Sequence, residues 1–227
     1  MGIWGDWETY KSWLVLDQGF SVAEGVPWLF YPTTQNNVLI INTELPEELY
    51  HERYIEIVRT RRKIPKGLYT IHDMTLKLDT QTGLAKMDAW VEASGAGLLI
   101  IDNLYRAMQN DINTNQGVNA LLDNLSYLIQ KYRVAITLVH HSRKVAYDLR
   151  RNMVVRQGAE DMGGNKYLAN RMNTIIELRK VTVPNADKAI LFIPEKATFE
   201  RTPIVPLTLS ITDTQFFPVL QGIEDNN

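Results

Sequence analysis

Three short runs of mostly apolar residues constrain the fold of this chain more than any other feature of its sequence. They cover 37–42, 97–102 and 134–139, and a polar residue ends or follows each of them. Runs of this length are typical of strands that are buried on both faces of a parallel sheet. Segments with helical periodicity separate the runs and lie over 13–24, 46–62, 83–94 and 118–132. This order predicts an α/β domain with a mainly parallel sheet between two layers of helices.

The last third of the chain has a different pattern. Candidate strands follow one another there without helices between them, at 174–179, 189–193, 207–211 and 216–220. Such strands predict an antiparallel extension at one edge of the sheet. We therefore expect a single domain over residues 1–227. Its first strand is expected to be very short or truncated, because only four residues precede Gly5.

Composition excludes several classes of site and partner. The chain has 227 residues, no cysteine and a formal net charge of −2. Without cysteine it forms neither disulfides nor thiolate metal sites, which agrees with a reducing cytoplasm. No apolar run approaches the roughly 20 residues of a membrane span, so we expect no membrane partner. The net charge gives no general attraction to nucleic acid, and any such contact requires a local basic patch.

Residues 5–12, with the sequence G-D-W-E-T-Y-K-S, keep the spacing of a phosphate-binding loop, in which Lys-Ser follows a glycine at a fixed distance. Such a loop directs backbone N–H groups and the positive end of a helix dipole at one place. Lys11 would then reach the outer phosphates, and the Ser12 hydroxyl would bind Mg²⁺. Two residues depart from the usual pattern: Tyr10 replaces the glycine before the lysine, and Glu8 places a carboxylate beside the phosphates. The alternative interpretation is an ordinary loop and helix cap.

Polar residues mark the ends of the three predicted strands, and parallel sheets bind ligands at the carboxyl ends of their strands. Asp102 could provide a second contact to Mg²⁺, or could cap a loop. Glu44 could deprotonate the water that attacks a terminal phosphate, or could cap the helix that begins near Pro46. Alternation along a strand allows only one of His140 and His141 to face inward, where it could bind a terminal phosphate. Zinc binding is the weaker alternative, because no Cys, Asp or Glu stands nearby at ligand spacing.

Together these segments resemble the RecA-like ATPases, and within them the RepA-type hexameric replicative helicases of plasmids and their phage and mobile-element relatives. The resemblance spans nearly the whole chain and is carried by 5–17, 21–25, 38–44, 98–105 and 138–144. In that family an aromatic residue before the loop lysine is a familiar variant. The resemblance implies a RecA-like, three-layer P-loop NTPase fold, with ATP and Mg²⁺ as cofactors.

The resemblance also implies roles for individual residues. Lys11 would bind phosphate, Glu44 would be the catalytic base, and His141, or else His140, would be the sensor of the terminal phosphate. The implied metal ligands are Ser12 and Asp102. The implied nucleotide-binding residues are Gly5, Thr9, Tyr10, Lys11, Ser12 and Trp13.

Enzymes of this family complete each ATP site with a basic pair from the neighbouring subunit, often Lys-x-Arg on a late strand. Here Lys196 occupies the lysine position, and Thr198 stands where the arginine would fall. Arg201 could substitute for that arginine. The resemblance therefore implies a homo-oligomer, a hexameric ring, with Lys196 and Arg201 as its trans finger.

The family also binds single-stranded DNA through central loops. The candidate here is the segment 143–171, which holds more basic than acidic residues. A positive loop with few aromatic residues would follow phosphates with little sequence preference. The alternative is a solvated loop whose arginines cap helices. The expected DNA-binding residues are Arg143, Lys144, Arg150, Arg151, Arg156 and Lys166.

The function expected from these features is an ATP-dependent motor on single-stranded DNA, namely a hexameric replicative helicase. One alternative is a RecA-like recombination or strand-annealing ATPase that assembles on DNA without unwinding it. The other is a degenerate nucleotide-binding scaffold that does not hydrolyse ATP, for which Glu8, Thr198 and the short first strand would be the reasons.

Overall fold

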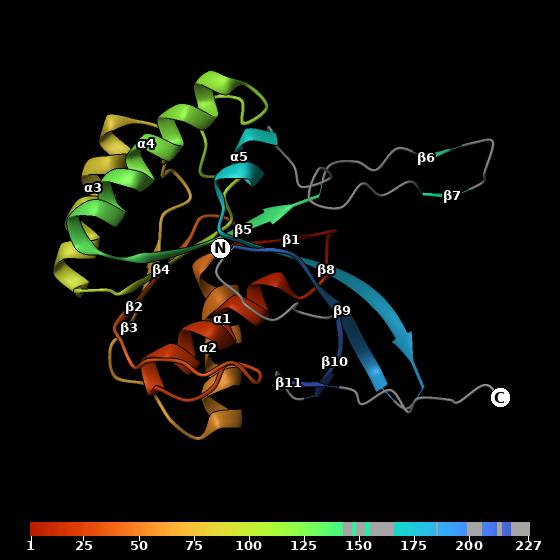
Figure 1. Cartoon of the computed structure of the whole chain (residues 1–227). Coiled ribbons are helices and arrows are strands. Elements are labelled where there is room, and N and C mark those ends of the chain that lie inside the picture. Colours follow the sequence, from red (N-terminus) through yellow and green to blue (C-terminus); the bar gives the residue numbers. More distant parts are fainter. Residues whose placement is uncertain are drawn as a thin grey trace.

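The computed structural model describes residues 1–142, 147–148, 153–154, 166–184, 186–198, 206–212 and 215–218. Its main feature is a nine-stranded sheet with the order β11-β10-β9-β8-β1-β5-β4-β2-β3 (Figure 1). These strands are β1 (Gly2–Gly5), β2 (Val38–Asn42), β3 (Leu68–His72), β4 (Leu98–Asp102), β5 (Ala135–His141), β8 (Thr174–Val183), β9 (Ala186–Ala197), β10 (Leu207–Thr212) and β11 (Gln215–Pro218). Two short strands, β6 (Tyr147–Asp148) and β7 (Met153–Val154), pair with each other.

The sheet is parallel over most of its width and antiparallel at one edge. The six neighbouring strands from β3 to β8 run parallel to one another. The strands β9, β10 and β11 then continue the sheet in antiparallel pairs. This arrangement confirms the predicted mainly parallel sheet with antiparallel strands at its C-terminal edge.

The short first strand lies near the centre of this sheet. Although β1 has four residues, it pairs with β5 on one side and β8 on the other, so that Gly5 lies opposite both His141 and Leu178. On the neighbouring strands, Asn42 lies opposite Asp102. Because these strands are parallel, the residues that follow them meet at one edge of the sheet.

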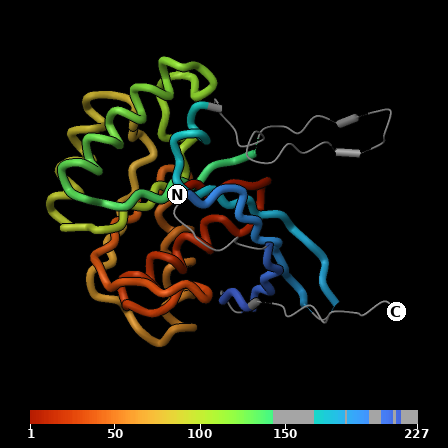
Figure 2. Tube along the Cα trace, in the orientation of Figure 1, coloured from red at the N-terminus to blue at the C-terminus, as the bar shows by residue number. Residues whose placement is uncertain are grey.

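Helices cover both faces of the sheet, as predicted. They are α1 (Lys11–Glu24), α2 (Glu47–Arg61), α3 (Gln81–Ser94), α4 (Asn115–Tyr132) and α5 (Lys166–Arg171). Figure 2 shows α1 and α2 on one face and α3, α4 and α5 on the other. Successive strand residues alternate between the two cores, so Val38 and Ile40 of β2 pack with α1 and α2, whereas Leu39 and Ile41 pack with α3 and α4. This alternation explains why each strand is apolar throughout.

Helices α1, α3 and α4 begin two or three residues earlier than their apolar periodicity predicts, and side-chain caps account for the last two. Helix α3 begins at Gln81, because the Thr80 hydroxyl accepts a hydrogen bond from the backbone N–H of Gly83. Helix α4 begins at Asn115, three residues before the predicted start at 118, because Thr114 accepts in the same way from Gly117. Both are side-chain N-caps, which periodicity alone does not reveal. Among the described residues, no helix combines the length and apolar character that a membrane span requires.

Candidate active site

The loop between β1 and α1 holds two residues in the left-handed conformation. Glu8 has a φ of 56°, and Tyr10, the residue before helix α1, has a φ of 61°. Glycine adopts this conformation without steric strain, whereas other residues do so at a cost of about 1–2 kcal/mol. The two departures from the phosphate-loop pattern therefore lie where the backbone would favour glycine.

Gly5, which ends β1, allows the loop to lie close to the neighbouring strand. A Cβ atom at this position would be 2.4 Å from the carbonyl oxygen of Leu178 and 2.9 Å from Oγ1 of Thr9. The buried Thr9 hydroxyl donates a hydrogen bond to the carbonyl oxygen of Asp6 at 2.9 Å. The first residue of the loop pattern is thus a glycine for steric reasons.

Lys11 is buried at the start of α1 and points back into the loop. Its Nζ donates hydrogen bonds to the carbonyl oxygens of Gly5 at 3.0 Å and Asp6 at 2.5 Å. Burial lowers the pKa of Lys11 to about 8, although the nearby carboxylates of Asp102 and Glu44 act in the opposite direction. The ammonium group therefore lies in an environment that a further anion would stabilise.

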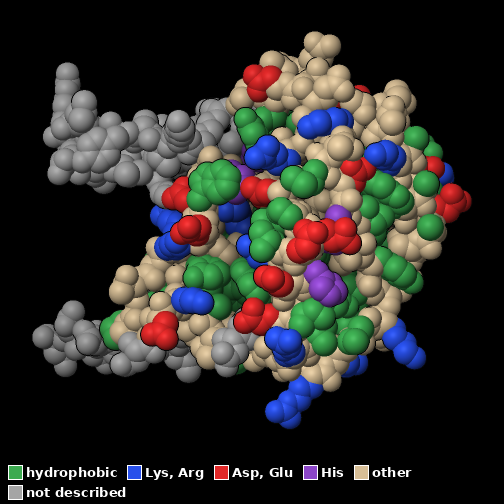
Figure 3. Space-filling model, turned by 180° about the vertical axis from the view of Figure 1, so that it is seen from behind, with side chains coloured by type: hydrophobic (Ala, Val, Ile, Leu, Met, Phe, Trp, Pro, Cys, Tyr) green, Lys and Arg blue, Asp and Glu red, His purple; other side chains and the backbone are tan. Residues whose placement is uncertain are grey.

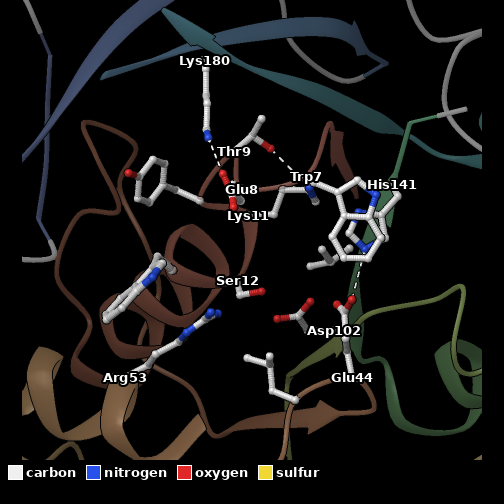
Figure 4. Close-up of a pocket in the computed structure, with 14 residues that line it drawn as sticks. Trp7, Glu8, Thr9, Lys11, Ser12, Glu44, Arg53, Asp102, His141 and Lys180 are labelled. Carbon is white, nitrogen blue, oxygen red and sulfur yellow. Dashed lines mark hydrogen bonds and ion pairs between the residues drawn. The ribbon is translucent and has the colours of Figure 1, made fainter. Parts of the chain in front are cut away.

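A pocket of about 380 Å³ lies over this loop, at the carboxyl edge of the sheet (Figure 4). This volume falls within the range of small-molecule sites, about 300–1,000 Å³. Figure 4 shows the labelled side chains of Lys11, Ser12, Asp102, Glu44 and His141 around one space. The predicted residues that line the pocket are Thr9, Tyr10, Lys11, Ser12, Trp13, Glu44, Asp102 and His141.

Asp102 is the most deeply buried carboxylate of the pocket. It is 2% exposed, and burial raises its pKa to about 6, although the neighbouring Ser12 hydroxyl lowers it. Among the residues that the structure describes, none donates a hydrogen bond to its Oδ1 atom. The buried Oδ1 of Asp102 and the neighbouring Ser12 hydroxyl are both hard oxygen ligands. Ser12 and Asp102 therefore fit a Mg²⁺ ion.

Glu44 is held in place by the turn that follows β2. The side chain of Asn42 accepts hydrogen bonds from the backbone N–H groups of Glu44 and Leu45, at 3.3 and 3.0 Å. Burial raises the pKa of Glu44, but the hydrogen bonds and charges of His141, Asn103 and Lys11 outweigh it, so the pKa lies below its usual value. Glu44 is therefore a carboxylate at neutral pH.

Asn103 connects Glu44 to His141. Its Nδ2 donates a hydrogen bond to Oε2 of Glu44 at 2.5 Å and lies 2.9 Å from Nε2 of His141. Asn103 is 1% exposed, and its carbonyl oxygen accepts a hydrogen bond from the Thr43 hydroxyl at 2.7 Å. The peptide bond that precedes it is cis. The only sequence signal for Asn103 is its place directly after the strand-terminal Asp102.

The two adjacent histidines have different surroundings. His141 lines the pocket and lies 3.4 Å from Oε1 of Glu44, measured from Nε2. His140 is 2% exposed and does not line the pocket. Their opposite directions follow from alternation along β5. The ring of Trp7, which is 70% exposed, stacks on His141 with 4.4 Å between the ring centroids.

The carboxylate of Glu8 pairs with a lysine at the rim of the pocket. Its Oε2 accepts a hydrogen bond from Nζ of Lys180 on β8 at 2.8 Å, and this contact lowers the pKa of Glu8. Both side chains are largely exposed. The negative charge that the sequence places beside the phosphate loop thus has a positive partner. No role was expected from the sequence for Lys180, Trp7 and Arg53, which line the pocket, or for Asn103, which contacts the pocket residues Glu44 and His141.

The remaining predicted residues lie away from this pocket or outside the described residues. Lys196 lies on β9, where its Nζ donates a hydrogen bond to the carbonyl oxygen of Asn170 at 2.9 Å, near the end of α5. Lys166 is the first residue of α5. The predicted residues outside the described part of the chain are Arg143, Lys144, Arg150, Arg151, Arg156 and Arg201.

Comparison with known protein families identifies the chain. The AAA domain family AAA_25 matches residues 2–146, which include the loop, the three strand ends and every residue that lines the pocket except Lys180. The chain belongs to this family. A comparison with curated proteins finds no match.

The fold of this AAA domain is similar to that of a solved structure, which is the ATPase domain of another protein. The two share 13% sequence identity with a TM-score of 0.69, and the match covers 96% of this chain and 84% of that chain. The family and this match establish a RecA-like P-loop ATPase fold, as the sequence predicted. Among the described residues of the AAA domain, no group of three His, Asp or Glu side chains is placed to hold a metal ion.

Proposed function

We propose that this chain is an ATP-hydrolysing motor that acts on single-stranded DNA, of the RepA type of hexameric replicative helicase. The observation that carries the proposal is the convergence of Lys11, Ser12, Glu44, Asp102 and His141 on one pocket of an AAA domain. These residues come from four separate segments of the chain, and each has the chemistry that one part of phosphoryl transfer needs.

The triphosphate would lie at the N-terminus of α1. The helix dipole and the free backbone N–H groups of its first turn favour anions there. Lys11 adds a buried positive charge. Its Nζ would exchange its hydrogen bonds to the loop carbonyl oxygens for contacts with the outer phosphates. Ser12 and Asp102 would hold Mg²⁺, which neutralises charge on the phosphates when it is bound.

Glu44 would accept the proton of the attacking water. Its depressed pKa keeps it deprotonated at neutral pH, as a base must be. His141 would contact the terminal phosphate and, through Asn103, link that contact to Glu44. Orientation of both groups by one amide supports a role in positioning the water.

The family resemblance is the basis for proposing single-stranded DNA as the partner and a ring of subunits as the assembly. Figure 3 shows acidic and basic side chains interspersed over the described part of the face seen from behind, in agreement with the net charge of −2. Apart from Lys166 on α5, the residues proposed to bind DNA lie outside the described part of the chain, as does Arg201 of the proposed trans finger.

The first test is nucleotide binding and turnover by Lys11→Ala beside wild type. We expect the variant to lose ATP binding, because it lacks the buried ammonium group, while Lys66→Ala, at an exposed position, binds as wild type does. Unchanged ATP affinity in Lys11→Ala would remove the phosphate-loop assignment.

Two further measurements separate the alternatives. Stimulation of ATP hydrolysis by single-stranded DNA excludes a non-hydrolysing scaffold, and strand displacement on a forked duplex excludes a recombination or annealing protein. The mass in solution, with and without Mg-ATP and an oligonucleotide, tests the ring. A monomer under all conditions would contradict it.

A further inference from the structure

Helix α2 brings a basic side chain, Arg53, into the nucleotide pocket. Arg53 lines the pocket together with Ser12 and Asp102. In Figure 4 its guanidinium group extends from α2 toward Ser12. The guanidinium is thus placed in the same pocket as the two residues proposed to hold Mg²⁺.

The packing of α2 explains this placement. Tyr50 and Ile57, seven residues apart, are buried and fix the inward side of the helix. Arg53 lies one turn after Tyr50 and therefore projects from nearly the same side. Its guanidinium carbon lies 5.5 Å from the ring centroid of Trp13, in the first turn of α1. A cation over an indole ring is attracted to it, so Trp13 restricts where the guanidinium can go.

Arg53 differs from another arginine of the same helix. The guanidinium of Arg61 pairs with the carboxylates of Asp17 at 2.5 Å and Glu24 at 3.0 Å, which ties α2 to α1. In the described part of the chain, no carboxylate lies within ion-pair distance of Arg53. Its guanidinium instead makes a cation–π contact with the ring of Trp13. Arg61 is satisfied by the fold, whereas Arg53 keeps its donors for an anion in the pocket.

We propose that Arg53, held by Trp13, binds the polyphosphate chain of the nucleotide from within the same subunit. This inference rests on the proposed function and assigns one more residue to its site. The pocket already holds the carboxylates of Glu44 and Asp102 against Lys11, so an incoming polyphosphate needs further positive charge. Thr198 stands where a neighbouring subunit would be expected to supply arginine. Arg53 supplies a guanidinium without that neighbour.

The test is calorimetric titration of the folded chain with inorganic tripolyphosphate and, separately, with ATP, both with Mg²⁺. We expect Arg53→Gln to weaken both ligands by about tenfold, as loss of a charge-assisted hydrogen bond does. Arg53→Lys should recover part of this affinity, since it keeps the charge but not the fork of donors. Arg59→Gln, at an exposed position of the same helix, is the matched control and should bind as wild type does.

Three results would overturn the inference. Equal affinity of Arg53→Gln and wild type for both ligands removes the contact. Weaker ATP binding with unchanged tripolyphosphate binding places Arg53 at the base or ribose instead. Wild type that binds neither ligand rejects the proposed function as well, which separates the two failures. Thermal melting of each variant establishes that it is folded. If Arg53→Gln is not folded, Arg53→Lys is the variant that is compared with wild type.

Discussion

The two sides of the pocket are built in different ways. On one side, the ends of β2, β4 and β5 present Glu44, Asn103 and His141, which contact one another through side-chain polar atoms. On the other side, the loop after β1 and the helix α2 present Glu8 and Arg53. Glu8 is held by an exposed ion pair, and Arg53 is held by an aromatic ring.

This difference follows from how each side is anchored. The register of the parallel strands fixes the strand ends, so their side chains keep the close distances that proton transfer needs. The loop and helices hold long side chains by weaker contacts, which suit binding of a flexible polyphosphate. We therefore expect changes to Glu44 and Asn103 on the strand side to alter turnover, and changes to Glu8 and Arg53 on the loop side to alter stability or affinity.

The largest effect is expected from Glu44→Gln. Loss of the proposed base should lower the rate of ATP hydrolysis by about 10²–10⁴-fold, while the affinity for ATP changes less than about twofold. Phosphate release and nucleotide titration measure the two quantities, with Glu48→Gln as an exposed control on α2. If the variant still turns over ATP, Glu44 is not the base and the strand side loses its proposed role.

Asp102→Asn should show that the buried charge of Asp102, on the strand side, lowers the stability of the folded protein. Burial raises the pKa of Asp102 from 3.8 to about 6, so the folded protein binds this proton more tightly than the unfolded chain. Wild-type stability therefore decreases as the pH rises from about 4 to about 6 and stays lower above it. At pH 7 without Mg²⁺, the Asn variant should be more stable by about 2–3 kcal/mol.

Thermal melting in EDTA at a series of pH values measures this difference. The gap between Asp102→Asn and wild type should narrow as the pH falls toward 4 and close below it, where the carboxyl group is protonated in both states. The same variant should lose the effect of Mg²⁺ on nucleotide affinity. A gap that does not depend on pH would mean that the buried charge is not its origin.

Asn103→Asp should separate positioning from folding. The variant keeps the Oδ1 acceptor for the backbone N–H of Arg106, but it loses the Nδ2 group that contacts Glu44 and His141. We expect kcat to fall by about tenfold with little change in KM. The new carboxylate and the lost hydrogen bond both raise the pKa of Glu44, so the acid limb of the pH profile should move to higher pH.

Asn119→Asp, at an exposed position on α4, makes the same change in net charge and is the control for Asn103→Asp. An unchanged kcat and an unchanged acid limb would show that Asn103 does not position the strand-side residues.

The smallest effect is expected on the loop side, from Glu8→Gly. The positive φ of Glu8 costs about 1 kcal/mol that glycine avoids, and its exposed ion pair with Lys180 contributes little. Thermal melting should show a gain in stability of about 0.5–1 kcal/mol. The same change at Glu52, inside α2, should lower stability by about 1 kcal/mol. Destabilisation by Glu8→Gly would mean that the ion pair outweighs the strain.

The local pattern of the sequence predicted much of the fold because it depends on near neighbours. The apolar runs that became β2, β4 and β5 were visible as consecutive residues, and the antiparallel edge as strands without helices between them. The starts of α3 and α4 were missed by two or three residues, because their caps are single hydrogen bonds of Thr80 and Thr114. Such bonds leave no periodic signal.

The candidate site divides in the same way. Lys11, Asp102 and Glu44 could be predicted as site residues because each stands at the start of a helix or after a strand whose direction the sequence implies. Asn103 and Arg53 could not. Their roles depend on which side chain lies opposite them after folding, and for Asn103 that partner is Glu44, 59 positions away.

The sequence by itself thus determined the kind and order of elements, and the polar residues that would reach one edge of the sheet. Only the tertiary structure decided which of those residues touch, that His141 rather than His140 lines the pocket, and that Lys180 on a distant strand neutralises Glu8. The physical reason is that periodicity and turn chemistry act over a few residues. Contacts between side chains depend instead on strand register and helix packing, which the whole core sets together.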